Sequence, residues 1–247
     1  MEYNLELLKK EIQVILNRGW IKGEGKGTSS AGLTFESLIG KTVDNLEIPD
    51  YHGIEIKTKY ATKHLYMTLF NATPDSFLFE IKRIHEKYGY PDKKNKNYKV
   101  FNVSIYGNTA ITISEIYMMK LYVDQNLKQV VLKITDKNNY TTDTLTAWSF
   151  EIIHEKLVRK FQYLLFVKTE RKWDKGDYYR YSKAILSKLK DFDEFLKLIE
   201  SGDIRITFKI SVFRSGKRIG QIHDHGTSFD IHEGAINKLF DTVYQLG

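Results

Sequence analysis

The chain has no cysteine, which excludes disulfide bonds and thiolate zinc sites. It has only three prolines among 247 residues and no low-complexity tract, so we find no linker and expect one folded domain. No apolar run is long enough to span a bilayer, and residues 1–17 lack the basic and apolar regions of a secretory signal. We therefore expect a cytoplasmic protein that is not bound to a membrane.

Basic and aromatic residues are both abundant. Lysine and arginine number 38 against 31 acidic residues, which gives a formal net charge of +7. A hydrophobic content of 42% is enough for a substantial core in a chain of this length. The basic surplus favours an anionic partner, and nucleic acid is the first candidate.

Hydrophobic periodicity predicts helices at both ends of the chain and strands between them. The helices are expected at residues 2–17, 35–41 (with Thr34 as N-cap), 77–88, 150–160, 192–200 and 234–243. The strands are expected at residues 54–59 and 65–70 as a pair, then at 98–106, 110–116, 120–124, 129–135, 163–169, 204–213 and 219–231. This order indicates a mixed α/β (α+β) fold.

One short segment carries the residue types of a metal-dependent hydrolase. Asp50 is followed by Glu55 and Lys57 in a strand-like context, and residues two apart on a strand share a face. If the turn at residues 51–53 folds Asp50 back, two carboxylates that suit Mg²⁺ meet an ammonium that can stabilise a phosphorane. The pattern predicts phosphodiester cleavage, but an ordinary surface ion pair is the alternative.

A second signal is a basic β-ribbon near the C-terminal end. Residues 205–225 form two predicted strands and a turn with few acids, and such a ribbon can contact guanines and phosphates in a major groove. The candidates for DNA contact are Arg205, Lys209, Arg214, Lys217, Arg218, His223 and His225. The two histidines share a strand face, so metal binding is an alternative, and a solvated hairpin is another.

Three further positions have weaker signals. Glu36 adds a carboxylate if its helix faces the acidic strand, and otherwise is a first-turn glutamate favoured by the helix dipole. Lys26 lies in a Gly/Lys-rich loop without Walker spacing, where it follows a nucleic-acid backbone or is simply solvated. Lys156 and Lys160 share a helix face and either approach a phosphate or are solvated. No G-x-S-x-G or H-E-x-x-H motif occurs.

Taken together, these residues resemble the MvaI/BcnI-type restriction endonucleases, relatives of the mismatch-repair enzyme MutH in the PD-(D/E)xK nuclease superfamily. The resemblance extends over almost the whole chain. It rests on Trp20, Lys26-Gly27, Thr34-Phe35-Glu36, Asp44-Asn45-Leu46, Pro49-Asp50, Ile54-Glu55-Ile56-Lys57, Trp148-Ser149-Phe150, Tyr178-Tyr179, Gly202-Asp203-Ile204, Ser215-Gly216-Lys217 and His223-Asp224-His225-Gly226-Thr227.

The resemblance implies a MutH-like fold, a central mixed sheet with flanking helices in two lobes around a DNA cleft. The catalytic lobe would span about residues 1–165 and the recognition lobe about 166–247, with exchange of segments. The Mg²⁺ ligands it implies are Asp50, Glu55 and the Ile56 carbonyl. It also implies Lys57 as the motif lysine, Glu36 as the acid on the preceding helix, and Lys156 as a lysine that MutH-type proteins place near the phosphate.

One position departs from the pattern. Asp230 stands where the resemblance leads us to expect a basic residue, so base specificity does not transfer residue by residue.

The implied activity is that of a type II enzyme acting on double-stranded DNA. A monomer would cut a short pseudosymmetric site such as CCNGG one strand after the other, with Mg²⁺ or Mn²⁺ as its substitute. A cognate DNA methyltransferase is implied genetically. A MutH-like repair nickase is the nearer alternative, and a non-catalytic DNA-binding module is the remote one.

Overall fold

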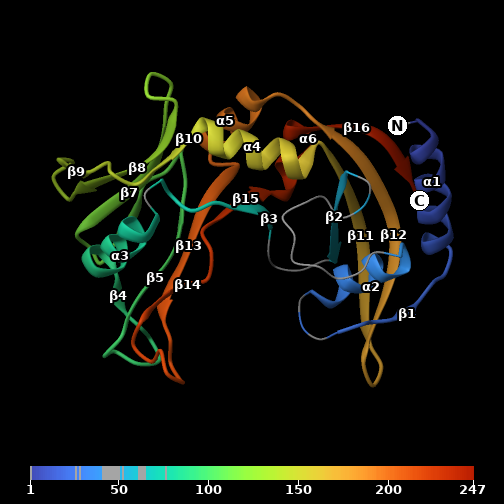
Figure 1. Ribbon diagram of the computed structural model, residues 1–247, viewed down its shortest axis with the longest axis horizontal. Helices are drawn as coiled ribbons and strands as arrows, with labels where there is room; N and C mark the ends of the chain where they lie inside the picture. The colour runs from blue at the N-terminus through green and yellow to red at the C-terminus, as the bar shows by residue number, and fades with distance from the viewer. Residues whose placement is uncertain are drawn as a thin grey trace. The chain divides into compact units, whose positions relative to one another are not determined.

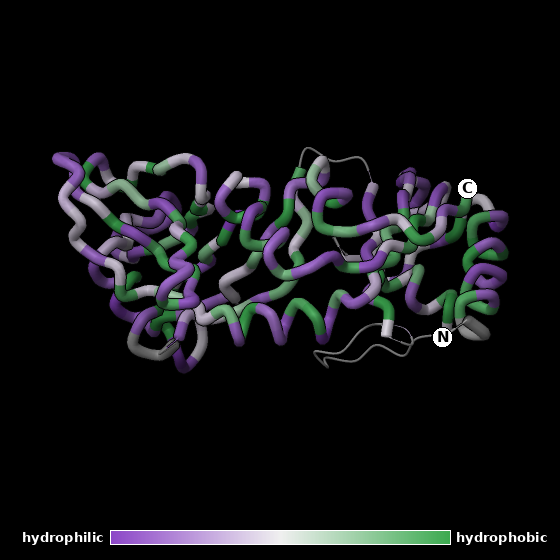
Figure 2. The backbone as a smooth tube through the Cα atoms, turned by 90° about the horizontal axis from the view of Figure 1, so that it is seen from above, coloured by the Kyte–Doolittle hydropathy of each residue, from purple (hydrophilic) through white to green (hydrophobic). Residues whose placement is uncertain are grey.

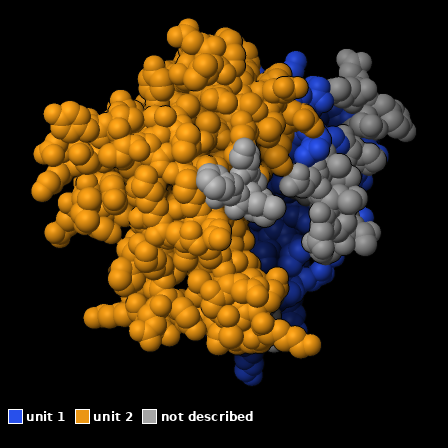
Figure 3. Space-filling model, turned by 60° about the vertical axis from the view of Figure 1, so that its left-hand side comes forward, with its two compact units in different colours: residues 1–65, 157–190, 237–247 blue, residues 66–156, 191–236 orange. Residues whose placement is uncertain are grey.

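The computed structural model describes residues 2–25, 27, 29–40, 51, 53–60, 65–75 and 77–247, without the side chains of residues 2–4 and 77–79. The chain forms two compact units, coloured separately in Figure 3. Unit 1 comprises residues 1–65, 157–190 and 237–247, and unit 2 comprises residues 66–156 and 191–236. The division into a catalytic and a recognition lobe stays a prediction. No helix among the described residues is long and apolar enough to cross a membrane.

Unit 1 contains a mixed sheet in the order β1-β12-β11-β2, with β16 also paired to β12 (Figure 1). Its strands are β1 (Ile21–Lys22), β2 (Ile54–Tyr60), β11 (Tyr163–Trp173), β12 (Asp177–Leu189) and β16 (Phe240–Leu246). Strand β2 runs parallel to β11, and the other pairs are antiparallel. The parallel register sets Glu55 beside Leu164 and Lys57 beside Phe166.

Two helices of unit 1 contribute to one hydrophobic core with this sheet, α1 (Glu2–Leu16) and α2 (Ser30–Leu38). Hydrophobic and hydrophilic residues alternate along α1, as Figure 2 shows, and Leu8 and Ile12 of α1 are buried with Phe35 of α2 and Ile56 of β2. Because neighbouring residues on a strand point to opposite faces, the burial of Ile56 in this core directs Glu55 and Lys57 to the other face of the sheet.

Unit 2 contains two antiparallel sheets. The first has the order β3-β15-β13-β5-β4 with β14 on β13, and the second has the order β10-β8-β7-β6 with β9 on β8. The first consists of β3 (Tyr66–Asn71), β4 (Tyr90–Pro91), β5 (Lys99–Ile105), β13 (Ile204–Val212), β14 (Ile222–Asp224) and β15 (Ser228–His232). The second consists of β6 (Ile111–Ile113), β7 (Tyr117–Asp124), β8 (Gln129–Asp136), β9 (Thr141–Asp143) and β10 (Ala147–Ser149).

The remaining helices are α3 (Phe77–Tyr88), α4 (Phe150–Phe161), α5 (Phe192–Glu200), a 3₁₀ turn at Glu233–Ala235 and α6 (Ile236–Leu239). Helix α5 is amphipathic, with Phe195 and Leu198 buried, and Asp191 caps its first turn by accepting the Glu194 N–H at 2.9 Å. Gly202 follows its end with φ +78°, a conformation that glycine adopts without strain, so the helix stops where the sequence predicted.

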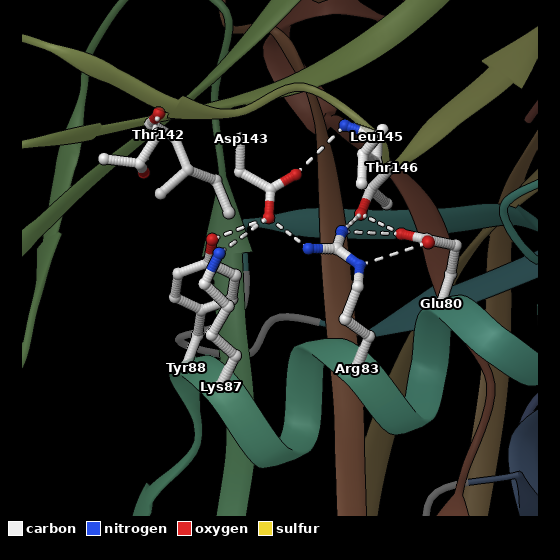
Figure 4. A network of polar contacts seen from close by, with 9 residues as sticks. Glu80, Arg83, Lys87, Tyr88, Thr142, Asp143, Leu145 and Thr146 are labelled. Atoms are coloured by element: carbon white, nitrogen blue, oxygen red, sulfur yellow. Dashed lines mark hydrogen bonds and ion pairs between the residues drawn. The ribbon is translucent and has the colours of Figure 1, made fainter.

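A buried polar network joins α3 to the end of β9 and to the β9–β10 connection (Figure 4). The Arg83 guanidinium donates to Glu80 at 2.7 Å and to Thr146 at 2.9 Å, and it pairs with Asp143. The Tyr88 hydroxyl donates to the same Asp143 carboxylate at 2.6 Å. Both acids thus have several donors, which is the condition under which buried charge is tolerated.

Most predicted elements are confirmed, but four are wrong in part. Strands β2 and β3 do not pair with each other, because β2 joins β11 and β3 joins β15. The predicted strand at residues 219–231 is two strands, since Gly226 has φ +101° and its N–H bonds to the Asp224 carboxylate. The predicted helix at 234–243 ends at Leu239, and the chain continues as β16 by pairing with β12.

The predicted start of α2 is also wrong. The helix begins at Ser30 rather than at residue 35, and Thr34 lies inside it. The Thr34 hydroxyl donates to the Ser30 carbonyl at 2.7 Å and accepts the Glu24 N–H at 2.8 Å, so it ties the preceding loop to the helix instead of capping it. This start places Glu36 in the second turn, which removes the interpretation of Glu36 as a first-turn glutamate.

Candidate active site and DNA-contact residues

A buried carboxylate on β2 is the centre of the candidate active site. The Glu55 side chain is only 1% exposed, and its Oε1 lies 2.5 Å from the Lys57 Nζ. Both residues project from the same face of the strand, as their spacing predicted. Since an unpaired buried carboxylate is costly, the Lys57 ammonium offsets the cost of burying the Glu55 charge in this position.

A second ammonium approaches the same carboxylate oxygen. Lys160, near the end of α4, has its Nζ 3.4 Å from Glu55 Oε1, and its side chain is 28% exposed. The next residue, Phe161, is buried and its ring centre lies 5.9 Å from the Lys57 Nζ. Helix α4 therefore brings a cation and an aromatic ring to the face of β2 that carries the candidate motif.

Sequence reasoning named two lysines on one face of α4, Lys156 and Lys160, and the resemblance implied a role for Lys156. The contact with Glu55 comes from Lys160. Lys156 is half-buried one turn earlier, and its role near the phosphate stays a prediction.

Glu36 of α2 faces strand β2. A side-chain carbon at Gly32 would lie 3.6 Å from Glu36 Oε1 and 3.5 Å from the Thr58 hydroxyl, so both polar groups lie near Gly32, where α2 approaches the strand closely. Thr58 alternates with Lys57 and belongs to the face that carries Ile56. The Glu36 carboxylate thus lies beside the strand of the motif, on the side of the α2 core.

Two predicted site residues, Asp50 and Lys26, lie outside the described residues. The donors that are described fit a hard divalent cation, because Glu55 offers a carboxylate oxygen whose position is fixed by two lysines. Among the described residues, no group of three or more histidine, aspartate or glutamate side chains is arranged to hold a metal. A complete ligand set therefore needs Asp50 or backbone oxygens in addition.

The basic ribbon is largely β13, β14 and the connection between them. Phe213 stacks on His223 with ring centres 4.1 Å apart, His223 lies 4.0 Å from His225, and the Arg218 guanidinium lies 4.0 Å from the Phe213 ring. These four side chains form a column of rings ending in a cation. Such a column provides flat surfaces and hydrogen-bonding edges, as base-contacting surfaces do.

His225 is held in a defined orientation. Its Nε2 lies 2.8 Å from the Ser211 hydroxyl, and its backbone N–H donates to the Lys209 carbonyl. Burial, with the charge of neighbouring His223 adding to it, lowers the pKa of His225 and favours the neutral ring. A neutral imidazole can donate and accept, which suits contact with a base edge.

The other predicted contact residues differ in their surroundings. The Lys209 Nζ lies 3.3 Å from the Ser228 hydroxyl on the polar face of the sheet. Lys217 is exposed in the β13–β14 connection. The Arg214 guanidinium forms an ion pair with Asp92 of the β4–β5 connection, so at least part of its charge serves the fold.

The model of the MvaI/BcnI restriction endonuclease family matches residues 9–240. The chain belongs to this family. A solved structure described as a complex of restriction endonuclease MvaI with cognate DNA substrate is 31% identical, with a TM-score of 0.85 and 98% of each chain covered. Restriction endonuclease MvaI in the absence of DNA is 29% identical, with a TM-score of 0.63 and 96% of each chain covered. A comparison with curated proteins gave no match.

Membership in the MvaI/BcnI family confirms two expectations from the sequence. The fold is the mixed α/β fold of these restriction endonucleases, and the protein is a type II site-specific deoxyribonuclease. The roles of individual residues, the metal and the target sequence are proposed below.

Proposed function

We propose that this protein cleaves both strands of duplex DNA at a short pseudosymmetric sequence, with Glu55 and Lys57 at the reaction centre. The observation that carries the proposal is the 2.5 Å contact between the buried Glu55 carboxylate and the Lys57 ammonium on one strand. Because the Glu55 carboxylate is buried, its interaction with Lys57 is screened less by solvent than that of a surface pair, so the two charges can act on a bound phosphate and metal.

Asp50, Glu55 and the Ile56 carbonyl would hold Mg²⁺, with Mn²⁺ as a substitute. Such an ion polarises the phosphate and lowers the pKa of a bound water when it is present. The lysines hold the Glu55 carboxylate in one orientation, which preorganises a ligand oxygen. Lys57 also places positive charge where the pentavalent phosphorus gains negative charge, and we assign it this electrostatic role rather than that of a base. The product would carry a 5′-phosphate.

Unit 2 would supply recognition through the polar face of β13 and the ring column ending at Arg218. Positive side chains there would contact phosphates, and the histidine edges would contact bases. The similar MvaI structure is a complex with a cognate DNA substrate, which supports duplex DNA as the ligand here. We further propose a CCNGG-like site, action as a monomer that nicks each strand in turn, and a cognate methyltransferase that protects host DNA.

Digestion of a sequenced supercoiled plasmid, followed by mapping of the ends, tests this function. We expect linear fragments with 5′-phosphates at one recurring sequence in Mg²⁺ and none in EDTA. A product that stays nicked would favour the MutH-like nickase. Binding to the plasmid without any cleavage under Mg²⁺ or Mn²⁺ would contradict the proposal and favour a non-catalytic binding module.

A further inference from the structure

One face of the β13 sheet is lined with polar side chains. Along β13 the even-numbered residues from Ile204 to Val212 are buried and the odd-numbered ones are half-buried. Arg205 and Thr207 therefore lie on the same face as Lys209 and Ser211. Because Ser211 contacts His225, this face is continuous with the predicted base-contacting residues.

Asp230 occupies the centre of this face but cannot reach a base. It is directly opposite Arg205 in the β13–β15 register and is 4% exposed. Its Oδ1 accepts from the Thr68 hydroxyl at 2.8 Å, and its Oδ2 accepts from the Thr207 hydroxyl at 2.7 Å. Both carboxylate oxygens are therefore engaged within the sheet, where the resemblance leads us to expect a basic side chain.

The guanidinium of Arg205 is held on three sides. Its Cζ lies 3.7 Å from the centre of the Tyr66 ring, its Nη1 donates to the Tyr106 hydroxyl at 3.1 Å, and its Nε lies 3.5 Å from Asp230 Oδ2. The Tyr66 ring is itself packed edge-on against His232 at 5.2 Å. An arginine fixed in this way loses little entropy when it binds a ligand.

One edge of the same guanidinium is available to a ligand. The Arg205 side chain is 22% exposed, and its Nη2 donates to no residue that the structure describes. A fixed, planar, partly exposed fork on a polar sheet face fits the O6 and N7 acceptors of guanine, which arginine binds in the major groove.

We propose that Arg205 is a specificity-determining residue that binds a guanine of the target, and that Asp230, Tyr66 and Tyr106 are its positioning residues. The positive charge expected at position 230 is supplied from the neighbouring strand, with the Asp230 carboxylate turned inward to hold it. The inference rests on the proposed function, since it needs a DNA target.

The test compares wild type with Arg205→Ala and Arg205→Lys on a set of duplexes. Each duplex carries one base change in the mapped cleavage site, and kcat/KM is measured for every position. We expect both variants to lose about 10- to 100-fold on the cognate site and to lose discrimination at one guanine only. Arg205→Lys keeps the charge but not the fork, so it remains informative if the alanine variant is less stable. Lys120→Ala, an exposed change on β7, is the control and should match wild type.

A milder substitution, at Tyr106, tests whether this residue positions the Arg205 guanidinium. Tyr106→Phe removes only the hydroxyl that accepts from Nη1, so we expect a loss of a few-fold at the same guanine and nowhere else. If the Arg205 variants lost the same activity on all sequences, and their DNA binding depended less steeply on salt concentration, Arg205 would contact a phosphate and the inference would be overturned. Unchanged discrimination in both Arg205 variants would also overturn it. Because wild type still cuts in these cases, such results leave the proposed function standing.

Discussion

Each unit has a polar cluster built around buried carboxylates, and the two clusters differ in the groups that surround these carboxylates. In unit 2 the Glu80 and Asp143 carboxylates share Arg83 and also receive Tyr88 and Thr146 hydroxyls (Figure 4). The Arg83 side chain is 14% exposed. Lys87 adds a contact of 3.6 Å to Asp143 from a side chain that is 47% exposed. Two cations thus match two acids, and the cluster links a helix to a sheet.

In unit 1 the cations outnumber the described acids. One described carboxylate, Glu55, faces two ammonium groups on the same oxygen, and the side chains of Lys57 and Lys160 are 25% and 28% exposed. A buried acid with an excess of cations around it can share those cations with a phosphate, whereas in unit 2 the two acids already occupy the two cations. The comparison teaches that the balance of cations and acids, more than burial of the acid, separates a reactive cluster from a structural one.

The largest effect should come from Lys57. Replacing it with alanine removes the charge in contact with Glu55, and we expect the cleavage rate to fall by a factor of about 100 to 1,000 while DNA binding in Ca²⁺ persists. Lys188→Ala, an exposed lysine on β12, is the matched control. Cleavage by Lys57→Ala at the rate of this control would remove the distinction between the two clusters.

Asp143→Asn, in the cluster of unit 2, should lower stability and leave cleavage nearly unchanged. It leaves Arg83 and Tyr88 with a weaker acceptor, so we expect the free energy of unfolding to fall by about 3 kcal/mol, measured by urea denaturation. Cleavage per folded molecule, assayed well below the melting temperature, should stay within about two-fold of wild type. A stable variant without cleavage would show that the network belongs to the active site.

The lowered pKa of Asp143 predicts that the stability of the folded state depends on pH. Burial alone would raise the pKa of Asp143, but hydrogen bonds from Tyr88, the Leu145 N–H and Arg83 together outweigh it and lower that pKa below its ordinary value of 3.8. The ionised carboxylate therefore stabilises the folded state above about pH 4, and this stabilisation is lost as the pH falls towards the lowered pKa. Between pH 5 and about pH 3, urea midpoints of wild type should fall more steeply than those of Asp143→Asn. Parallel slopes would contradict this.

Lys160→Gln should have the smallest effect. Lys57 still holds Glu55 at 2.5 Å, so we expect the cleavage rate to fall by about ten-fold and the melting temperature to change little. The comparison with Lys188→Gln corrects for loss of general attraction to DNA. If Lys160→Gln instead lowered stability as much as Asp143→Asn, the contact would be structural, like the network of unit 2.

The sequence predicted the contact between Glu55 and Lys57 better than its surroundings. The two-residue spacing of Glu55 and Lys57 depends only on strand geometry. Long-range pairing was out of reach, because nothing local in Ile54–Tyr60 says that its partner is β11, more than 100 residues away. For the same reason, the contact of Lys160 with Glu55 and the pairing of Arg205 with Asp230 became visible only in the folded chain.

The most direct test of the central claim is plasmid cleavage by Glu55→Gln, which keeps the size and shape of the side chain but removes its charge. The account predicts that this variant melts within a few degrees of wild type, binds the mapped target in Ca²⁺ and produces no linear DNA in Mg²⁺ while wild type completes the digestion. Linear product from Glu55→Gln at the wild-type rate would contradict it.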